Sequence, residues 1–207
     1  MTNGMLITFE GVEGCGKTTH VKLLAQYLKT KGYPVVRTLE PGGTKLGEKI
    51  RELLLHSKEP LKAYTEVLLF AADRSQHVNE VVLPALKAGQ IVICDRFIDS
   101  TTAYQIGGRG LPEEKVQQLN ALSSEGLVPQ LTFLLEIDAS EGLGRAVGGG
   151  DRFERASLEF HERVRAGYQK LAQQNPDRIK IINSNQEINQ VQDEIRRIVE
   201  KFLYEKQ

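Results

Sequence analysis

The stretch Gly11-Val12-Glu13-Gly14-Cys15-Gly16-Lys17-Thr18 decides the fold, because it fits the pattern G-x-x-x-x-G-K-[ST] at every fixed position. The residues before it, 5–9, form a short apolar run typical of a strand, and residues 21–28 after it repeat apolar side chains at helical spacing. Glycines let successive backbone N–H groups of such a loop point inward, and the helix N-terminus adds partial positive charge. The strand–loop–helix context predicts a phosphate-binding loop, with a chance match as the alternative.

Two residues of this loop and one distant carboxylate are candidates for the chemistry. Lys17 is expected to reach the β- and γ-phosphates of a nucleotide, and the Thr18 hydroxyl to bind Mg²⁺. Asp95 ends the apolar run 91–94, where a Mg²⁺ ligand, direct or through water, is expected; the alternative is a helix cap. The predicted ATP-binding residues are Gly11, Val12, Glu13, Gly14, Cys15, Gly16, Lys17, Thr18 and Thr19.

Apolar runs alternate with helical patterns along the rest of the chain. Strands are predicted at 5–9, 35–39, 91–94, 131–137 and 178–183, and helices at about 44–56, about 63–88 with a kink at Pro84, and from 188 to 202. The uninterrupted run 91–94 is typical of a strand buried on both faces. This α/β alternation predicts a parallel sheet with helices on both faces.

Composition limits the remaining possibilities. The 207 residues are expected to form a single domain, 1–207. Lys+Arg and Asp+Glu are both 27, which argues against a nucleic-acid or membrane-surface coat. We see no membrane span and no signal peptide. The two cysteines, Cys15 and Cys94, have no disulfide or zinc spacing, so a soluble cytoplasmic protein is expected.

A glycine triplet, 148–150, precedes the charged run 151–155. This pattern is typical of a mobile flap within a domain, here a short lid at about 142–156. The chain lacks the N-K-x-D element of GTP switches and the extra loop lysine of partition-type ATPases. A phosphate loop combined with an arginine-bearing flap points to a nucleoside or nucleotide kinase.

The ordered set of motifs resembles the bacterial thymidylate kinases, end to end. The motifs are 9–19, Glu40-Pro41-Gly42-Gly43-Thr44, Phe70-Ala71-Ala72-Asp73-Arg74, Asp95-Arg96-Phe97-Ile98-Asp99-Ser100, Ala103-Tyr104-Gln105 and Asp151-Arg152-Phe153-Glu154. The resemblance implies a P-loop NTPase fold with a five-stranded parallel sheet. It also implies transfer of the γ-phosphate of ATP to dTMP with Mg²⁺, giving dTDP and ADP for dTTP synthesis, by a homodimer.

The resemblance assigns roles in binding the acceptor dTMP. Arg51 and Arg96 would hold its phosphate, while Phe70 would cover the thymine ring. Arg74, Thr101 and Gln105 would reach the base, Tyr104 would lie against the sugar, and Glu13 would hold the 3′-hydroxyl. The predicted dTMP-binding residues are Glu13, Glu40, Arg51, Phe70, Arg74, Arg96, Thr101, Tyr104 and Gln105. Without the resemblance, Arg51 would be interpreted as a solvated arginine and Phe70 as a core residue. Tyr104 would be either a core or a surface residue, and Glu13 a solvent-facing loop residue.

The predicted catalytic residues are Lys17, Asp95, Arg96 and Arg152. Because loop positions 12–15 contain no arginine, stabilisation of the transition state is assigned to Arg152, with Arg145 and Arg155 as helpers. For Arg155 the alternative is a surface salt bridge. The chain departs from the bacterial pattern at Leu39, where an arginine is usual, which leaves the environment of Glu40 open.

Two other functions compete with this prediction. The first is another small kinase acting on a different nucleoside or nucleotide. The second is a nucleotide-binding switch without transferase activity, which would leave Arg51, Phe70, Arg74 and Arg96 without a purpose.

Overall fold

The computed structural model describes residues 4–145 and 150–205, so part of the predicted lid, 146–149, lies outside the described residues. The strands are β1 (Met5–Glu10), β2 (Val35–Leu39), β3 (Ile91–Asp95), β4 (Leu131–Glu136) and β5 (Ile179–Asn183). The helices are α1 (Lys17–Thr30), α2 (Lys45–His56), α3 (Ala63–His77), α4 (Leu83–Lys87), α5 (Ile98–Thr101), α6 (Glu113–Ser123), α7 (Ala139–Arg145), α8 (Leu158–Gln174) and α9 (Ile188–Tyr204), with π-helical turns η1 (Val78–Val82) and η2 (Thr102–Gly108).

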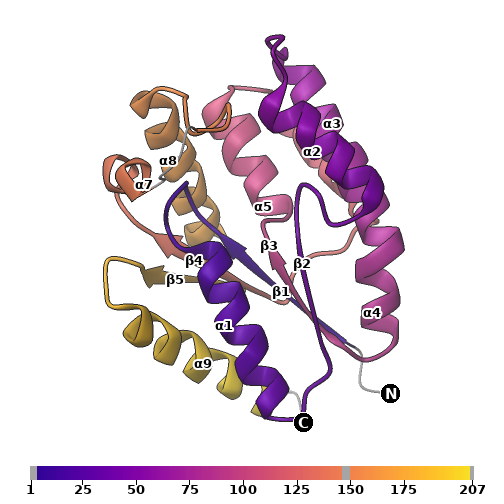
Figure 1. The fold of residues 1–207 in the computed structure, drawn as a ribbon, viewed down its shortest axis with the longest axis vertical. Coiled ribbons are helices and arrows are strands. Elements are labelled where there is room, and N and C mark those ends of the chain that lie inside the picture. Colours follow the sequence, from indigo (N-terminus) through magenta and orange to yellow (C-terminus); the bar gives the residue numbers. More distant parts are fainter. Residues whose placement is uncertain (1–3, 146–149, 206–207) are drawn as a thin grey trace.

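The five strands form one parallel sheet in the order β2-β3-β1-β4-β5 (Figure 1). β1 and β3 occupy the interior of the sheet, and their residues are almost all buried. The predicted strands and the predicted parallel sheet are therefore confirmed, with differences of at most one residue at the strand ends.

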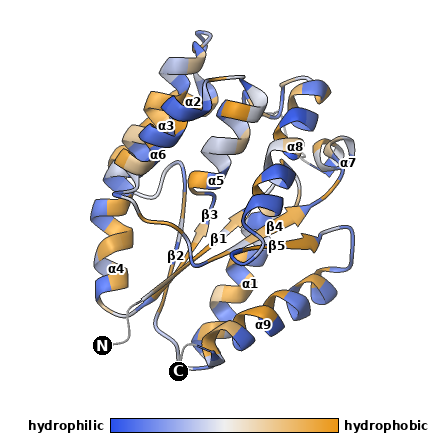
Figure 2. Cartoon of the chain, turned by 180° about the vertical axis from the view of Figure 1, so that it is seen from behind, coloured by the Kyte–Doolittle hydropathy of each residue, from blue (hydrophilic) through white to orange (hydrophobic). Residues whose placement is uncertain are grey.

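Helices cover both faces of this sheet, as the side chains of β1 show. Leu6 packs in a cluster with Val78, Val82 and Ala85 from η1 and α4. Its neighbour Ile7 belongs to the larger cluster that α1 and α9 help to build. Because successive strand side chains point to opposite faces, the two clusters lie on opposite sides of the sheet. Figure 2 shows the strands as predominantly hydrophobic between helices of mixed character.

The predicted long helix at 63–88 is helical along its length but not uniform. It divides into α3, η1 and α4, and the π-helical turn η1 lies directly before Pro84 in the first turn of α4. Proline has no N–H to donate and its ring clashes with the preceding turn, so a wider turn there accommodates it. The helices α5, α6 and α8 and the turn η2 were not anticipated from periodicity.

The carboxyl ends of the parallel strands gather the candidate site residues at one edge. The phosphate loop follows β1, Glu40 follows β2, and Asp95 ends β3. This is the edge at which open α/β sheets bind ligands. Within the described residues, no helix has both the length and the apolarity needed to span a bilayer.

Candidate active site

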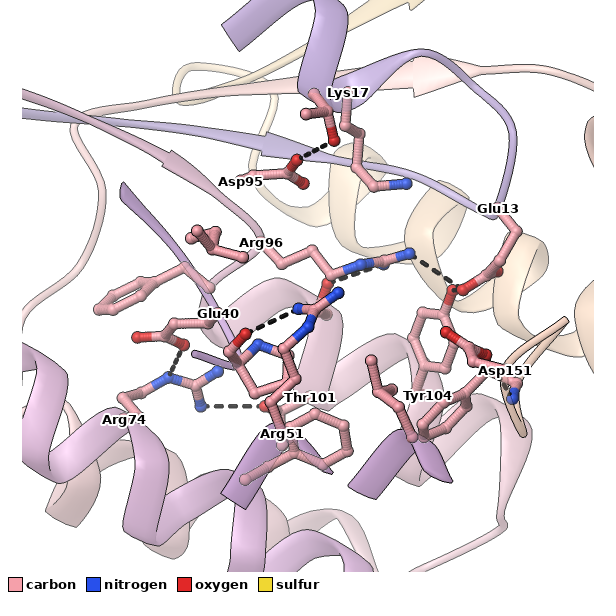
Figure 3. A pocket seen from close by; sticks show the side chains of 18 of the residues that line it. Glu13, Lys17, Glu40, Arg51, Arg74, Asp95, Arg96, Thr101, Tyr104 and Asp151 are labelled. Carbon is pink, nitrogen blue, oxygen red and sulfur yellow. Dashed lines mark hydrogen bonds and ion pairs between the residues drawn. The ribbon is translucent and has the colours of Figure 1, made fainter. Parts of the chain in front are cut away.

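A pocket of about 500 Å³ opens at this edge, between the phosphate loop and α3 (Figure 3). It brings together side chains that are up to 141 positions apart in the chain, from Glu13 to Glu154. All of the predicted acceptor-binding residues line it: Glu13, Glu40, Arg51, Phe70, Arg74, Arg96, Thr101, Tyr104 and Gln105. Lys17, Thr18 and Asp95 line the same pocket, so the donor-side and acceptor-side candidates share one space.

The phosphate loop has the backbone geometry that its glycines allow. Gly14 has φ +69°, and a Cβ there would collide with the carbonyl oxygen of Gly142. Lys17 is buried, and its Nζ donates to the carbonyl oxygens of Gly11 at 3.1 Å and Val12 at 2.7 Å. The ammonium therefore lies over the loop, bound to groups that carry no net charge.

Thr18 and Asp95 lie side by side, as predicted. The Thr18 hydroxyl donates to Asp95 Oδ2 at 2.6 Å (Figure 3). A hydroxyl and a carboxylate are hard oxygen donors, and Mg²⁺ is commonly held by one or two such protein groups together with substrate phosphates. The pair fits a magnesium ion, although the described residues contain no group of three or more His, Cys, Asp or Glu that could hold a metal unaided.

Arg96 adopts a left-handed backbone conformation, with φ 72°, directly after β3. Such a conformation is uncommon for a non-glycine residue and is typical of functional sites. Its guanidinium donates to Glu13 Oε1 at 3.0 Å and to the Gly11 carbonyl at 3.1 Å. Burial acts to raise the pKa of the Glu13 carboxyl, but Arg96, His161 and Lys17 outweigh it and hold that pKa well below its usual range. Glu13 is therefore a permanent anion beside the loop.

A buried network behind Arg96 was missed by sequence reasoning. Ser100 Oγ lies 3.2 Å from Arg96 Nη1, 2.7 Å from the Tyr168 hydroxyl and 2.5 Å from Glu10 Oε2. Glu10 Oε1 also accepts from the backbone N–H of Phe97 at 2.8 Å. Burial, reinforced by the charge of Asp99, raises the pKa of Glu10 to about 7. These contacts fix the turn that presents Arg96.

Arg74 is buried at the far end of the pocket and is held by several acceptors. It donates to Glu40 Oε2 at 2.8 Å and to Thr101 Oγ1 at 2.9 Å (Figure 3). It also donates to Asn120 Oδ1 at 2.8 Å. The other Glu40 oxygen lies 2.8 Å from His77 Nδ1. Glu40 thus has two partners on α3 itself, which settles the environment that Leu39 had left open.

Aromatic rings form the wall between the two ends of the pocket. Tyr104 packs edge-on against Phe153 with ring centroids 5.7 Å apart, and Phe70 lies 6.0 Å from the same ring. The Tyr104 hydroxyl bonds both Glu13 oxygens. Arg51 faces this space with its Nη1 bound to the Pro41 carbonyl at 2.7 Å, and no described carboxylate pairs with it. Arg51 therefore leaves positive charge available in the pocket.

No hydrogen bond or ion pair joins the three flap arginines to the described phosphate loop. Arg152 donates to Glu66 Oε2 at 2.5 Å and to the Leu54 carbonyl at 3.0 Å, and it does not line the pocket. Arg145 bonds Glu141 and the carbonyl of Ser184 beyond β5, and Arg155 is exposed. The assignment of Arg152 to the transition state thus stays a prediction, and it requires release from Glu66.

Three buried residues at this site were not anticipated, and they differ in how far the sequence signals them. Glu66 precedes Phe70 and Arg74 by four and eight residues, so helical spacing could have placed it on their face. His161 and Tyr168 come from α8, and no local pattern connects them with the phosphate loop. His161 lies 3.4 Å from Glu13 and bonds the Phe153 carbonyl at 3.0 Å.

Comparisons with known proteins agree with this geometry. The model of the thymidylate kinase family matches residues 9–195. Thymidylate kinase of Synechococcus sp. (strain JA-3-3Ab) is 55% identical over 180 residues, 87% of each chain, and that of Gloeobacter violaceus is 45% identical over 98% of each. The crystal structure of thymidylate kinase from Ehrlichia chaffeensis superposes with a TM-score of 0.78 at 38% identity, covering 95% of this chain and 99% of that one. These matches show that the chain belongs to the thymidylate kinase family.

Proposed function

We propose that this protein transfers the γ-phosphoryl group of ATP to dTMP, giving ADP and dTDP, a step of dTTP synthesis. One observation carries the proposal: a single pocket joins Lys17 of the phosphate loop to the base-reading wall of Phe70, Arg74 and Gln105. A nucleotide switch would need the first part and not the second.

The donor phosphates bind at the loop. The inward N–H groups of residues 11–17 and the N-terminus of α1 attract phosphate oxygens, and Lys17 exchanges its loop carbonyls for the β- and γ-phosphates. Thr18 and Asp95 would hold Mg²⁺, which when bound would supply positive charge against the charge of the phosphates.

Cations align the two anions. An acceptor phosphate is mostly deprotonated at pH 7, because its second pKa is near 6, so the reaction needs alignment more than a strong base. Arg51 and Arg96 line the pocket between its two ends and hold this phosphate in line with the donor. Arg152 adds charge to the transferred group after leaving Glu66, with Arg145 and Arg155 as helpers.

The deoxyribose and the base select the acceptor. Tyr104, held by Glu13, packs against the sugar and leaves no room for a 2′-hydroxyl, while Glu13 holds the 3′-hydroxyl. Phe70 covers the thymine ring. Arg74, with Thr101 and Glu40 holding it in place, donates to a base carbonyl, and Gln105 bonds the ring N–H.

A panel of acceptors tests this function. ADP formation from ATP and Mg²⁺ is measured with dTMP, dUMP, dCMP, dGMP and thymidine, and dTMP is expected to have the highest kcat/KM. Chelation of Mg²⁺ should abolish turnover, and its addition should restore it. Transfer to thymidine in preference to dTMP would contradict the proposal and favour a nucleoside kinase.

A homodimer is also proposed, on a specific surface. The helix α3 packs beside both α2 and α6, and these three helices expose large apolar side chains. Those residues are Leu46, Leu53, Tyr64, Leu68 and Leu122. Exposed apolar patches mark association surfaces, and a second copy of the chain is the occupant that the family resemblance implies. Sedimentation should show a dimer, and Leu68→Glu should shift it to monomer without changing the fold.

The compartment is proposed to be the cytoplasm. Cys15 and Cys94 are both free and buried, which suits a reducing environment. Fractionation of cells that express the tagged protein tests this directly.

A further inference from the structure

Glu66 is a buried acid bonded to the pocket-lining residue Gln105, and the proposed reaction gives it no task. It is 1% exposed and accepts hydrogen bonds from three side chains. Gln105 Nε2 donates to its Oε1 at 2.8 Å, Arg109 donates to both oxygens at 3.0 Å, and Arg152 donates to Oε2 at 2.5 Å. The two guanidinium groups compensate the buried charge, so the contact with Gln105 needs a separate explanation.

That contact determines which way the Gln105 amide points. A carboxylate only accepts hydrogen bonds, so the branch of the amide beside Glu66 has to be the NH₂ group. The carbonyl Oε1 is thereby placed on the other branch, and among the described residues it has no hydrogen-bond partner. Gln105 is fully buried in the protein and lines the pocket. An unpaired buried acceptor of this kind favours a ligand that brings a donor.

An unused donor lies on the same wall. Arg74 uses its Nε and Nη1 groups to donate to Glu40, Thr101 and Asn120. Its Nη2 makes no hydrogen bond to the described residues. Arg74 and Gln105 both line the pocket, as does Phe70, so the pocket offers one unused donor and one unpaired acceptor. Thymine presents the complementary pair, a carbonyl oxygen adjacent to a ring N–H. Cytosine presents the opposite pair, an amino group adjacent to a ring nitrogen that accepts.

We propose that Glu66 is a positioning residue that sets the preference for thymine over cytosine by locking the amide of Gln105. If the amide turned over, its NH₂ would face the base and suit the ring nitrogen of cytosine, but its carbonyl oxygen would then meet the Glu66 carboxylate. The repulsion between these two acceptors prevents the turn. The inference rests on the proposed function, because it concerns how the same pocket reads the acceptor base.

The substitution Glu66→Gln removes the lock with little change in shape. A glutamine at this position can present either an oxygen or an NH₂ group, so both orientations of Gln105 become allowed. The ratio of kcat/KM for dTMP to that for dCMP should fall by about tenfold or more, through loss with dTMP and gain with dCMP. Glu66→Asp is the companion variant: it retains a charged partner for Arg109 and Arg152 but withdraws the acceptor from Gln105, and it should lower the same ratio.

Two controls separate positioning from a general structural role. Arg109→Lys disturbs the ion pair of Glu66 without touching Gln105, so it should lower stability and leave the dTMP-to-dCMP ratio unchanged. In a Gln105→Ala background, adding Glu66→Gln should have no further effect on the ratio. An unchanged ratio in folded Glu66→Gln and Glu66→Asp, or an equal fall in the Gln105→Ala background, overturns the inference. A wild-type protein that does not prefer dTMP instead overturns the proposed function.

Discussion

The hydroxyl of Tyr104 lies 2.7 and 2.6 Å from the two carboxylate oxygens of Glu13, and so connects η2 to the phosphate loop. The two residues are 91 positions apart in the chain. Arg96 reaches the same carboxylate from the end of β3. The residues proposed to bind the acceptor are thus bonded directly to the loop proposed to bind the donor.

Tyr104→Phe tests this connection. The variant keeps the ring but loses a hydrogen bond to a charged group, so stability should fall by about 1.5–3 kcal/mol and KM for dTMP should rise. Urea unfolding and steady-state kinetics measure the two effects. Tyr27→Phe is the matched control, since its hydroxyl bonds the exposed Glu200 and should matter far less. Equal losses in both variants would mean that the Glu13 contact has no special role.

Lys17→Met should inactivate the protein without unfolding it. In the structure the Lys17 ammonium bonds loop carbonyl oxygens and makes no ion pair with any described carboxylate, so its loss leaves no buried charge unpaired. Loss of a preorganised cation at the phosphates should lower kcat by about 10²-fold or more. Lys22→Met, an exposed change on the same helix, serves as the control. Retained turnover in Lys17→Met would show that this loop does not hold the donor.

Glu10 should make stability depend on pH. Its pKa is raised from 4.5 to about 7 by burial, so the folded state favours the protonated acid. The stabilisation is complete below pH 4.5 and is lost as the pH rises through about 7, with a slope of up to about 1.4 kcal/mol per pH unit. Glu10→Gln stays neutral, so its free energy of unfolding should rise relative to that of the wild type as the pH increases across this range.

Chemical denaturation from pH 5 to pH 8 measures that gain. Glu48→Gln, a change at an exposed position, is the matched control: its free energy of unfolding should depend on pH in the same way as that of the wild type. Parallel curves for Glu10→Gln and the wild type would show that this carboxyl does not titrate in the window.

Arg152→Ala decides between two tasks for the flap arginine. If Arg152 leaves Glu66 to stabilise the transition state, the single-turnover rate should fall by about 10³-fold. Glu66 keeps Arg109 as a partner, so the variant should remain folded. Arg155→Ala, at an exposed neighbouring position, should cost much less. A lower melting temperature with an unchanged single-turnover rate would leave Arg152 with an anchoring role alone.

The class of fold could be predicted from the amino-acid sequence, together with the loop proposed to bind the donor. The loop 11–18 is contiguous, and its function depends on backbone conformation that glycines dictate locally. The strands were also predictable from local sequence, because a short apolar run such as 91–94 indicates a buried strand. The acceptor roles were predicted from the family resemblance of the motifs; helical spacing adds only that Phe70 and Arg74 lie on one face.

The contacts that hold those residues in place become visible only in the folded protein. Glu66 locks Gln105, Tyr168 and Glu10 support Arg96, and Glu40 finds its partners on α3. Each of these contacts joins positions far apart in the chain, and the orientation of an amide or a guanidinium depends on which acceptors the fold brings to it. Local sequence patterns do not predict such contacts, because they form only when distant elements pack together.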